Sequence, residues 1–176
     1  MLYTILLSLH SILRWLVLIF GLLAIIRSVN GMRFKRGFTG QDNQISRLFT
    51  SFLDIQVLIG LILYFVLSPI TTTAMQNFGG AMGNSGTRYF LVEHSVLMLL
   101  ALIAAHVGRV MVRRVDKTAP KDGGSRGELA RKVEIAVRKH RAAATWFAVS
   151  LVLVLAAIPW PFIFPDRPWL RFFGLF

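Results

Sequence analysis

The chain has 176 residues, of which 55% are hydrophobic, and its mean hydropathy of +0.62 is higher than that of an ordinary soluble domain. It carries a formal net charge of +12 and has no cysteine. The lack of cysteine excludes disulfides, thiolate metal sites, iron–sulfur clusters and covalent attachment of a c-type haem, so any cofactor must be held noncovalently or by nitrogen and oxygen ligands.

Four apolar segments are long enough to cross the hydrocarbon core of a bilayer, at about 2–26, 48–67, 89–112 and 142–164. The sequence therefore predicts an all-α integral membrane protein that forms a single domain over 1–176, a four-helix transmembrane bundle. The first segment has neither a basic n-region nor a small-residue cleavage site, so we expect it to be retained as a span.

Lysine and arginine are distributed unevenly between the connections. Five lie between the first two spans and eleven lie from Arg109 to Arg141, whereas the second connection contains only Arg88. The positive-inside rule then places the first connection and the basic loop 113–140 in the cytoplasm and both termini outside it. A nucleic-acid partner is not expected, because no aromatic residues are interleaved with the charges, and attraction to membrane lipid headgroups is the simpler explanation.

The segments that connect the spans also contain patterns that predict their structure. Residues 71–88 are rich in Gly, Asn and Thr and contain no phosphate-binding spacing, which predicts a plain loop. From Glu128 onwards apolar residues recur at helical spacing, so the fourth helix should begin in the cytoplasm. Pro159 and Pro161 flank Trp160 and should end that helix at an aromatic membrane interface.

Ionisable residues inside the spans are the most informative, because a charge at depth costs at least about 2.5–3.5 kcal/mol. These residues are His10 and Arg14 in the first span, Asp54 in the second, and Glu93, His94 and His106 in the third. Gly21 and Gly60 are expected to allow close contact between helices.

The histidines group by depth in the membrane. At a rise of about 1.5 Å per residue, His10 lies about 12 Å from the outer end of its helix and His94 about 9 Å beyond Arg88. His106 and His140 both lie near the inner face. Because the iron of a b-type haem takes two imidazoles from facing helices, the depths predict an outer haem between His10 and His94, and a second between His106 and His140.

Alternatives remain for several of these residues. His106 and His140 are also typical of snorkelling or hydrogen-bonded interface residues. Arg14 is expected to pair with Glu93 or Asp54, or to bind a haem propionate or a quinone carbonyl.

Four stretches carry a family resemblance: HSILRWLVL from His10, IQVLIGLILY from Ile55, EHSVLMLLAL from Glu93 and IPWPF from Ile158. With them the chain resembles the small four-helix bacterial membrane proteins commonly labelled "cytochrome b". The resemblance implies a haem-binding electron-transfer role in the bacterial cytoplasmic (inner) membrane, and it transfers ligand roles to His10 and His94 only. The depths of the histidines allow one haem b per chain or two. Relatives can hold histidine where this chain has Asp54, a departure that weakens the two-haem version.

Two functions follow as hypotheses. The first is a b-type haem protein that carries single electrons, with quinone as a candidate donor or acceptor; the second is an accessory or structural subunit of a respiratory or photosynthetic membrane complex that binds partner helices, lipid or pigment. The sequence favours an electron-transfer protein over a stand-alone enzyme, since it has no nucleotide, flavin or thiol motif. The candidate cofactor-binding residues are His10, His94, Arg14, Glu93, His106 and His140, with His10 and His94 as metal ligands.

Overall fold

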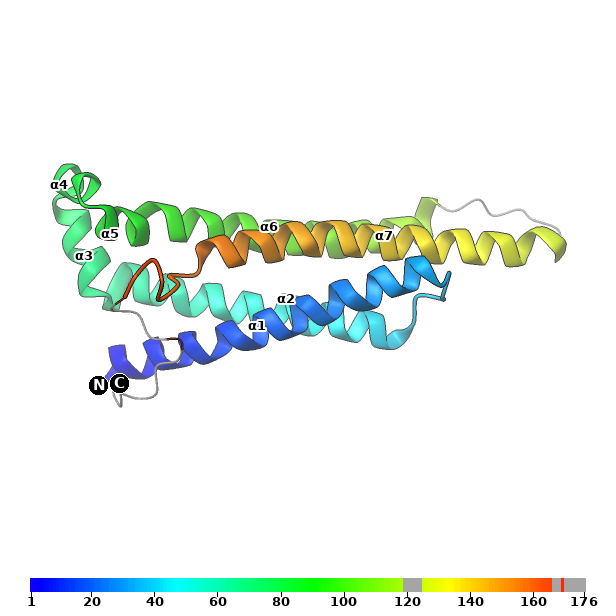
Figure 1. Ribbon diagram of the computed structural model, residues 1–176, viewed down its shortest axis with the longest axis horizontal. Helices are drawn as coiled ribbons and strands as arrows, with labels where there is room; N and C mark the ends of the chain where they lie inside the picture. The colour runs from blue at the N-terminus through cyan, green and yellow to red at the C-terminus, as the bar shows by residue number, and fades with distance from the viewer. Residues whose placement is uncertain (119–124, 166–168, 170–176) are drawn as a thin grey trace.

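The computed structural model describes residues 1–118, 125–165 and 169, and within them every regular element is helical. Four long helices are joined or extended by shorter helical pieces (Figure 1). The elements are α1 (Leu2–Arg33), α2 (Gly40–Ile62), a π-helical turn (Leu63–Leu67), α3 (Pro69–Gln76), α4 (Phe78–Gly83), α5 (Ser85–Arg88), a second π-helical turn (Tyr89–Glu93), α6 (His94–Thr118) and α7 (Ser125–Ala157).

The long helices lie side by side along the long axis of the molecule. Around the bundle, α1 packs against α2 and α7, α7 packs against α6, and α6 closes the ring against α2, so that α1 and α6 are diagonal to each other. The start of α1 and the end of α7 lie at the same end as α3, α4 and α5, which we call the α3 end (Figure 1). The α1–α2 connection and the start of α7 lie at the opposite end, which we call the basic end.

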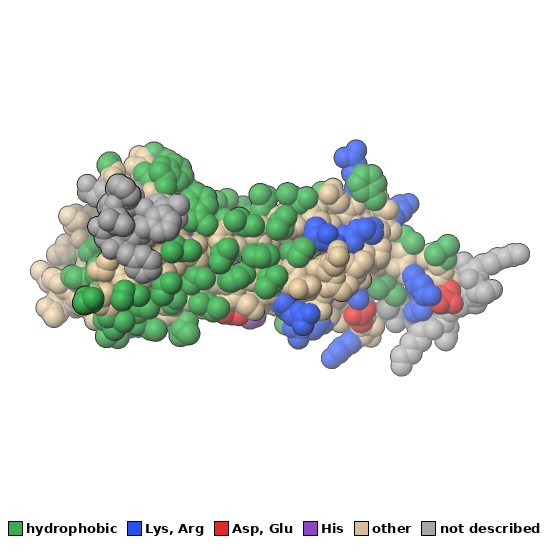
Figure 2. All heavy atoms as spheres, turned by 90° about the horizontal axis from the view of Figure 1, so that it is seen from below, with side chains coloured by type: hydrophobic (Ala, Val, Ile, Leu, Met, Phe, Trp, Pro, Cys, Tyr) green, Lys and Arg blue, Asp and Glu red, His purple; other side chains and the backbone are tan. Residues whose placement is uncertain are grey.

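In the part of the chain that the structure describes, four helices are long and apolar enough to cross a membrane: Leu2–Arg33, Gly40–Leu67, Ser85–Thr118 and Gly127–Ala157. The predicted number of spans is thereby confirmed, and the protein is a multi-pass, four-helix transmembrane protein. Figure 2 shows apolar side chains over one part of its length, while Lys and Arg gather over the other.

The bounds of the fourth span and of the basic loop differ from the prediction. Helix α7 ends at Ala157, not near 164, because Pro159 disfavours helical geometry at the residue before it. Most of 113–140 is helical rather than a loop, since α6 continues to Thr118 and α7 begins at Ser125. Pairs four residues apart, such as Lys132 with Glu128 at 2.7 Å, support this charged part of α7.

Residues 71–88 were expected to form a plain loop, and this prediction is wrong. The segment contains the end of α3 together with α4 and α5. Pro69 occupies the first turn of α3, and two asparagines cap the helices that follow. The Asn77 side chain accepts a hydrogen bond from the backbone N–H of Gly80 at 3.1 Å, and that of Asn84 accepts one from Thr87 at 2.9 Å.

Glycines bring the helices close together in the core. A Cβ atom on Gly21 would lie 2.9 Å from the ring of Phe49, and one on Gly108 would lie 2.8 Å from Cβ of Trp146. Phe49 and Phe147 are fully buried and contact each other edge to face, with ring centroids 5.5 Å apart. The expectation of a close helix contact at Gly21 is confirmed.

We expect Gly108→Ala to lower the stability of the protein by about 1–3 kcal/mol, because the added methyl group would overpack the α6–α7 contact against Trp146 and Phe147. Gly37→Ala is the matched control, since no atom lies within 4 Å of a Cβ built there. Thermal unfolding in detergent would measure both. Equal transition temperatures for the two variants would contradict the close packing at Gly108.

Candidate functional site

Two histidines from diagonal helices face each other inside the bundle. His10 belongs to α1, and His94 is the first residue of α6. Their ring centroids are 6.3 Å apart and their planes are inclined by 65°. Since α1 and α6 are diagonal, this pair crosses the interior of the bundle.

A hydrogen bond and the preceding helical turn determine the position of the His94 ring. Its Nδ1 atom lies 2.6 Å from the carbonyl oxygen of Ala157, the last residue of α7. With the proton on Nδ1, the ring donates to this carbonyl, and Nε2 keeps its lone pair for another partner. The π-helical turn Tyr89–Glu93 directly precedes His94, and such turns often occur at functional sites.

His10 lies in a space that Gly60 leaves open on α2. A Cβ atom at Gly60 would come within 3.2 Å of Cε1 of His10, so a larger residue there would press on the imidazole. Nδ1 of His10 is buried and makes no hydrogen bond of good geometry within the described residues, although the backbone of Gln56 lies close to the ring. A buried nitrogen without a partner marks a place where a group from outside the chain can bind.

A cavity of about 140 Å³ adjoins both histidines. A single buried water needs only about 10–15 Å³, so the cavity has room for an organic ligand. Gln56 is 3% exposed, and its Oε1 atom is also buried without a partner among the described residues. The lining combines apolar and polar side chains, among them Leu7, His10, Ser11, Arg14, Gln56, Leu63, Tyr64, Phe90, His94 and Met98.

Arg14 borders the cavity, and within the described residues it forms no ion pair with Glu93 or Asp54, the two acids expected as partners. Its guanidinium donates a hydrogen bond to the carbonyl of Trp169, and the indole of Trp15 donates to the same oxygen at 3.2 Å. Glu93 instead forms an ion pair with Arg88 at 2.9 Å. The π-helical turn between Arg88 and Glu93 changes the register of the helix, which brings these two residues onto one face.

His106 and His140, the proposed second pair of ligands, have separate partners. Nε2 of His106 lies 2.7 Å from Oδ1 of Asp54, and both side chains are about half exposed. His140 is fully buried; its Nε2 lies 3.1 Å from the carbonyl oxygen of Arg36, and its ring packs against Phe38. The structure therefore brings His10 and His94 together but shows no contact between His106 and His140 in the part of the chain that it describes.

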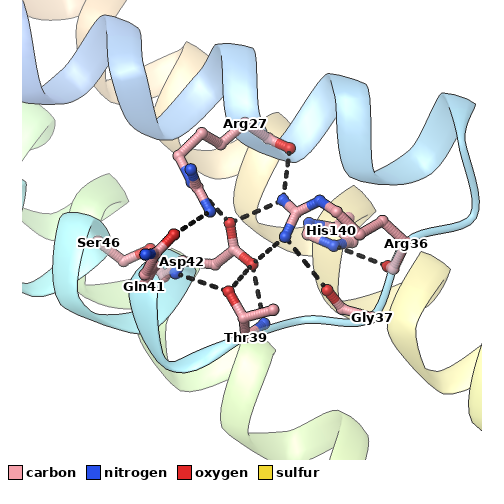
Figure 3. A network of polar contacts seen from close by, with 8 residues as sticks. All are labelled: Arg27, Arg36, Gly37, Thr39, Gln41, Asp42, Ser46 and His140. Carbon is pink, nitrogen blue, oxygen red and sulfur yellow. Dashed lines mark hydrogen bonds and ion pairs between the residues drawn. The ribbon is translucent and has the colours of Figure 1, made fainter.

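The basic end contains a polar network that the sequence analysis did not single out (Figure 3). Asp42 is 4% exposed and accepts hydrogen bonds from Arg27 at 2.9 Å and from both terminal nitrogens of Arg36, each at 2.9 Å. Asp42 also forms a reciprocal capping box with Thr39 at the start of α2. The T-x-x-D spacing from Thr39 to Asp42 was the available signal.

The turn before this network holds Arg36 in position. Lys35 adopts a left-handed backbone conformation with φ of 48°, and the N–H of Arg36 bonds to the carbonyl of Gly31 at 3.0 Å, as in a Schellman motif. The hydrogen bond to Asp42 raises the pKa of Arg36 above its ordinary value, so this guanidinium stays charged. The network thus ties the end of α1 to the start of α2.

Comparison with family models, with curated proteins and with solved structures finds no match to this chain. The resemblance to proteins labelled "cytochrome b" therefore stays a prediction from sequence. Among the described residues, no three His, Asp or Glu side chains group as a metal site. A pair of imidazoles is nevertheless the number of protein ligands that a low-spin haem iron takes.

The separation of the two rings matches that of two imidazoles bound to one metal ion. An imidazole nitrogen binds a metal at about 2 Å and lies about 1 Å from the centre of its ring, so two imidazoles on opposite sides of one ion have centroids about 6 Å apart. The observed separation is 6.3 Å. The backbone carbonyl that orients His94 through Nδ1 is a usual support for a metal-binding histidine.

Proposed function

We propose that the protein is a b-type haem protein that carries single electrons within the membrane, and that His10 and His94 would hold the haem iron. The observation that carries the proposal is the 6.3 Å separation of two imidazoles from diagonal helices beside a cavity. When bound there, a haem would supply the one-electron redox chemistry.

The residues of the chain have distinct tasks in this proposal. Ala157 holds the His94 ring through Nδ1, and Gly60 leaves room for the His10 ring. Arg14 adds a positive charge at the rim, suited to a propionate carboxylate or a quinone carbonyl. The apolar lining from Leu63, Phe90 and Met98 keeps water out and so influences the redox potential.

The orientation in the membrane belongs to the same proposal. Lys and Arg concentrate at the basic end, so the positive-inside rule places that end in the cytoplasm and the histidine pair near the opposite surface. Both termini are then extracytoplasmic, and the membrane is the cytoplasmic membrane of a bacterium. Quinone, which is soluble in the membrane, is the proposed exchange partner for electrons.

An optical spectrum of the purified protein, reduced with dithionite, tests the proposal. We expect the sharp α band of a low-spin b-type haem and one haem per chain. A content of two would point to a further site, for which His106 and His140 are the remaining histidines. A chain that contains no haem after expression with added haem precursor would contradict the proposal and favour the accessory-subunit function.

A further inference from the structure

The contact line between α2 and α6 carries polar groups that reach the surface of the bundle, although both helices are spans. The first level is the pair of Asp54 and His106, whose side chains are 46% and 52% exposed. About one turn towards the basic end, Nη1 of Arg109 donates to the hydroxyl of Thr50 at 3.3 Å. Thr50 is buried, but Asp54, His106 and Arg109 are ionisable and at least partly exposed on a span, which is expensive unless they bind something there.

About one further helical turn towards the basic end, α2 and α6 each carry another arginine. Arg47 on α2 and Arg113 on α6 are exposed, and both lie close enough to Arg109 to repel it. Asp54 is the acid that attracts Arg109. We call Arg47, Arg109 and Arg113, together with Arg114, the next residue of α6, the arginine cluster.

Within the described residues, the arginine cluster has few counter-charges from the protein, and Asp54 is the only acid that attracts a member of it. Within the described residues, no ion pair joins any of its four members to a carboxylate, whereas Asp42, Glu93, Asp116 and Glu128 are each paired with a cation elsewhere. Asp54 is held by His106. An anion from outside the chain can therefore bind to these arginines.

A groove on α6, next to the arginine cluster, indicates that the anion carries an apolar chain. The groove has a volume of about 410 Å³ and is lined by Leu102, Ile103, His106, Val107, Val110, Met111 and Arg114. Its lining is mostly apolar towards the α3 end and cationic at Arg114. From Leu102 to Arg114 the helix rises about 18 Å, a length comparable to that of a lipid acyl chain and about half the thickness of a bilayer.

We propose that the arginine cluster and this groove form a binding site for an anionic phospholipid. The phosphate is bound by Arg109, Arg113 and Arg114, and one acyl chain lies along Leu102, Ile103 and Val110. Thr50 orients Arg109, and the hydrogen bond from His106 to Asp54 reduces the repulsion that a free carboxylate would exert on the phosphate. A soluble anion would use the arginines alone, whereas a phospholipid uses both parts of the site.

Native mass spectrometry of the protein released from nanodiscs tests the site. The nanodiscs contain equal amounts of phosphatidylglycerol and phosphatidylcholine with the same acyl chains. We expect the wild type to retain phosphatidylglycerol preferentially and the variant Arg109→Gln/Arg113→Gln to lose that preference by roughly fivefold per arginine. The control Lys132→Gln/Arg138→Gln removes the same charge from the exposed part of α7 and should keep the preference.

A second variant tests the groove without altering charge. Val110 is 45% exposed, so Val110→Trp should fold and fill the groove, and we expect it to lower the retention of both lipids. Equal retention of the two lipids by the wild type, or an unchanged preference in the double arginine variant, would refute the site. Displacement of the lipid by millimolar inorganic phosphate would also refute the site, because it would indicate a soluble anion. A lipid-free dimer would refute it as well, because a second copy of the chain would then cover this surface.

Discussion

Replacing either His10 or His94 with alanine is expected to reduce the haem content of the purified protein from about one per chain by at least tenfold. Each substitution removes one of the two imidazoles whose centroids lie 6.3 Å apart. A haem iron with one protein ligand is no longer low-spin and is held less tightly, so the sharp α band should disappear as well. Haem extraction and the reduced spectrum would measure both effects.

His106→Ala is the matched control, because its side chain is half exposed and bonds to Asp54 rather than to a residue at the cavity. We expect this variant to keep the haem content and spectrum of the wild type. His140→Ala is less suitable as a control, since His140 is fully buried and its loss would leave a hole beside Gly31.

Free imidazole separates a ligand role from a structural one. In the alanine variants the space left by the missing ring adjoins the 140 Å³ cavity, so added imidazole should enter it and restore the low-spin spectrum. A merely structural histidine would not be replaced in this way. A low-spin spectrum that survives in His10→Ala or His94→Ala without imidazole would show that the ligands lie elsewhere.

Much of this architecture is visible in the sequence, because hydropathy over long windows depends on composition alone. The four spans follow from it, and the equal depth of His10 and His94 follows from the helical rise between each histidine and its flanking residues. The short helices α3, α4 and α5 were missed, because Gly and Asn indicate loops as readily as they indicate the helix caps that Asn77 and Asn84 provide.

The partners of the charged residues were harder to predict than the spans. Glu93 pairs with Arg88 rather than Arg14 because a π-helical turn changes the helical register, and the sequence carries no clear signal for such a turn. Arg14 bonds to a backbone carbonyl at Trp169, 155 residues away along the chain. Local periodicity does not describe a contact between residues so far apart in the sequence.

Asp42→Ala is expected to lower the stability of the protein by about 2–3 kcal/mol, the largest effect we predict for a residue outside the candidate cofactor site. The substitution removes the carboxylate that caps α2 through Thr39, a contribution of about 1 kcal/mol. It also leaves two guanidinium groups, those of Arg27 and Arg36, facing each other without an anion. Unpairing a fully buried charge costs about 3–5 kcal/mol, but these arginines are 31% and 36% exposed, so solvent reduces the cost.

Two further variants divide this effect into its parts. Asp42→Asn keeps an oxygen that can accept from Thr39 but removes the charge, so it should lose less stability than Asp42→Ala. Asp116→Ala is the matched control, since Asp116 also pairs with a cation, Lys139 at 2.6 Å, but its side chain is 58% exposed. A pair of this kind is worth less than about 1 kcal/mol.

Thermal unfolding in one detergent, at low and at high salt, would compare the three variants. We expect the order Asp42→Ala, Asp42→Asn, Asp116→Ala from the largest loss to the smallest, with salt affecting Asp116→Ala least because little electrostatic stabilisation is lost there. Asp42 joins α2 to α1 through Arg27 and to the connecting turn through Arg36, whose carbonyl in turn contacts His140 of α7. The loss of one carboxylate should therefore loosen three of the four spans at the basic end, and equal losses for Asp42→Ala and Asp116→Ala would show that the network does not hold them together.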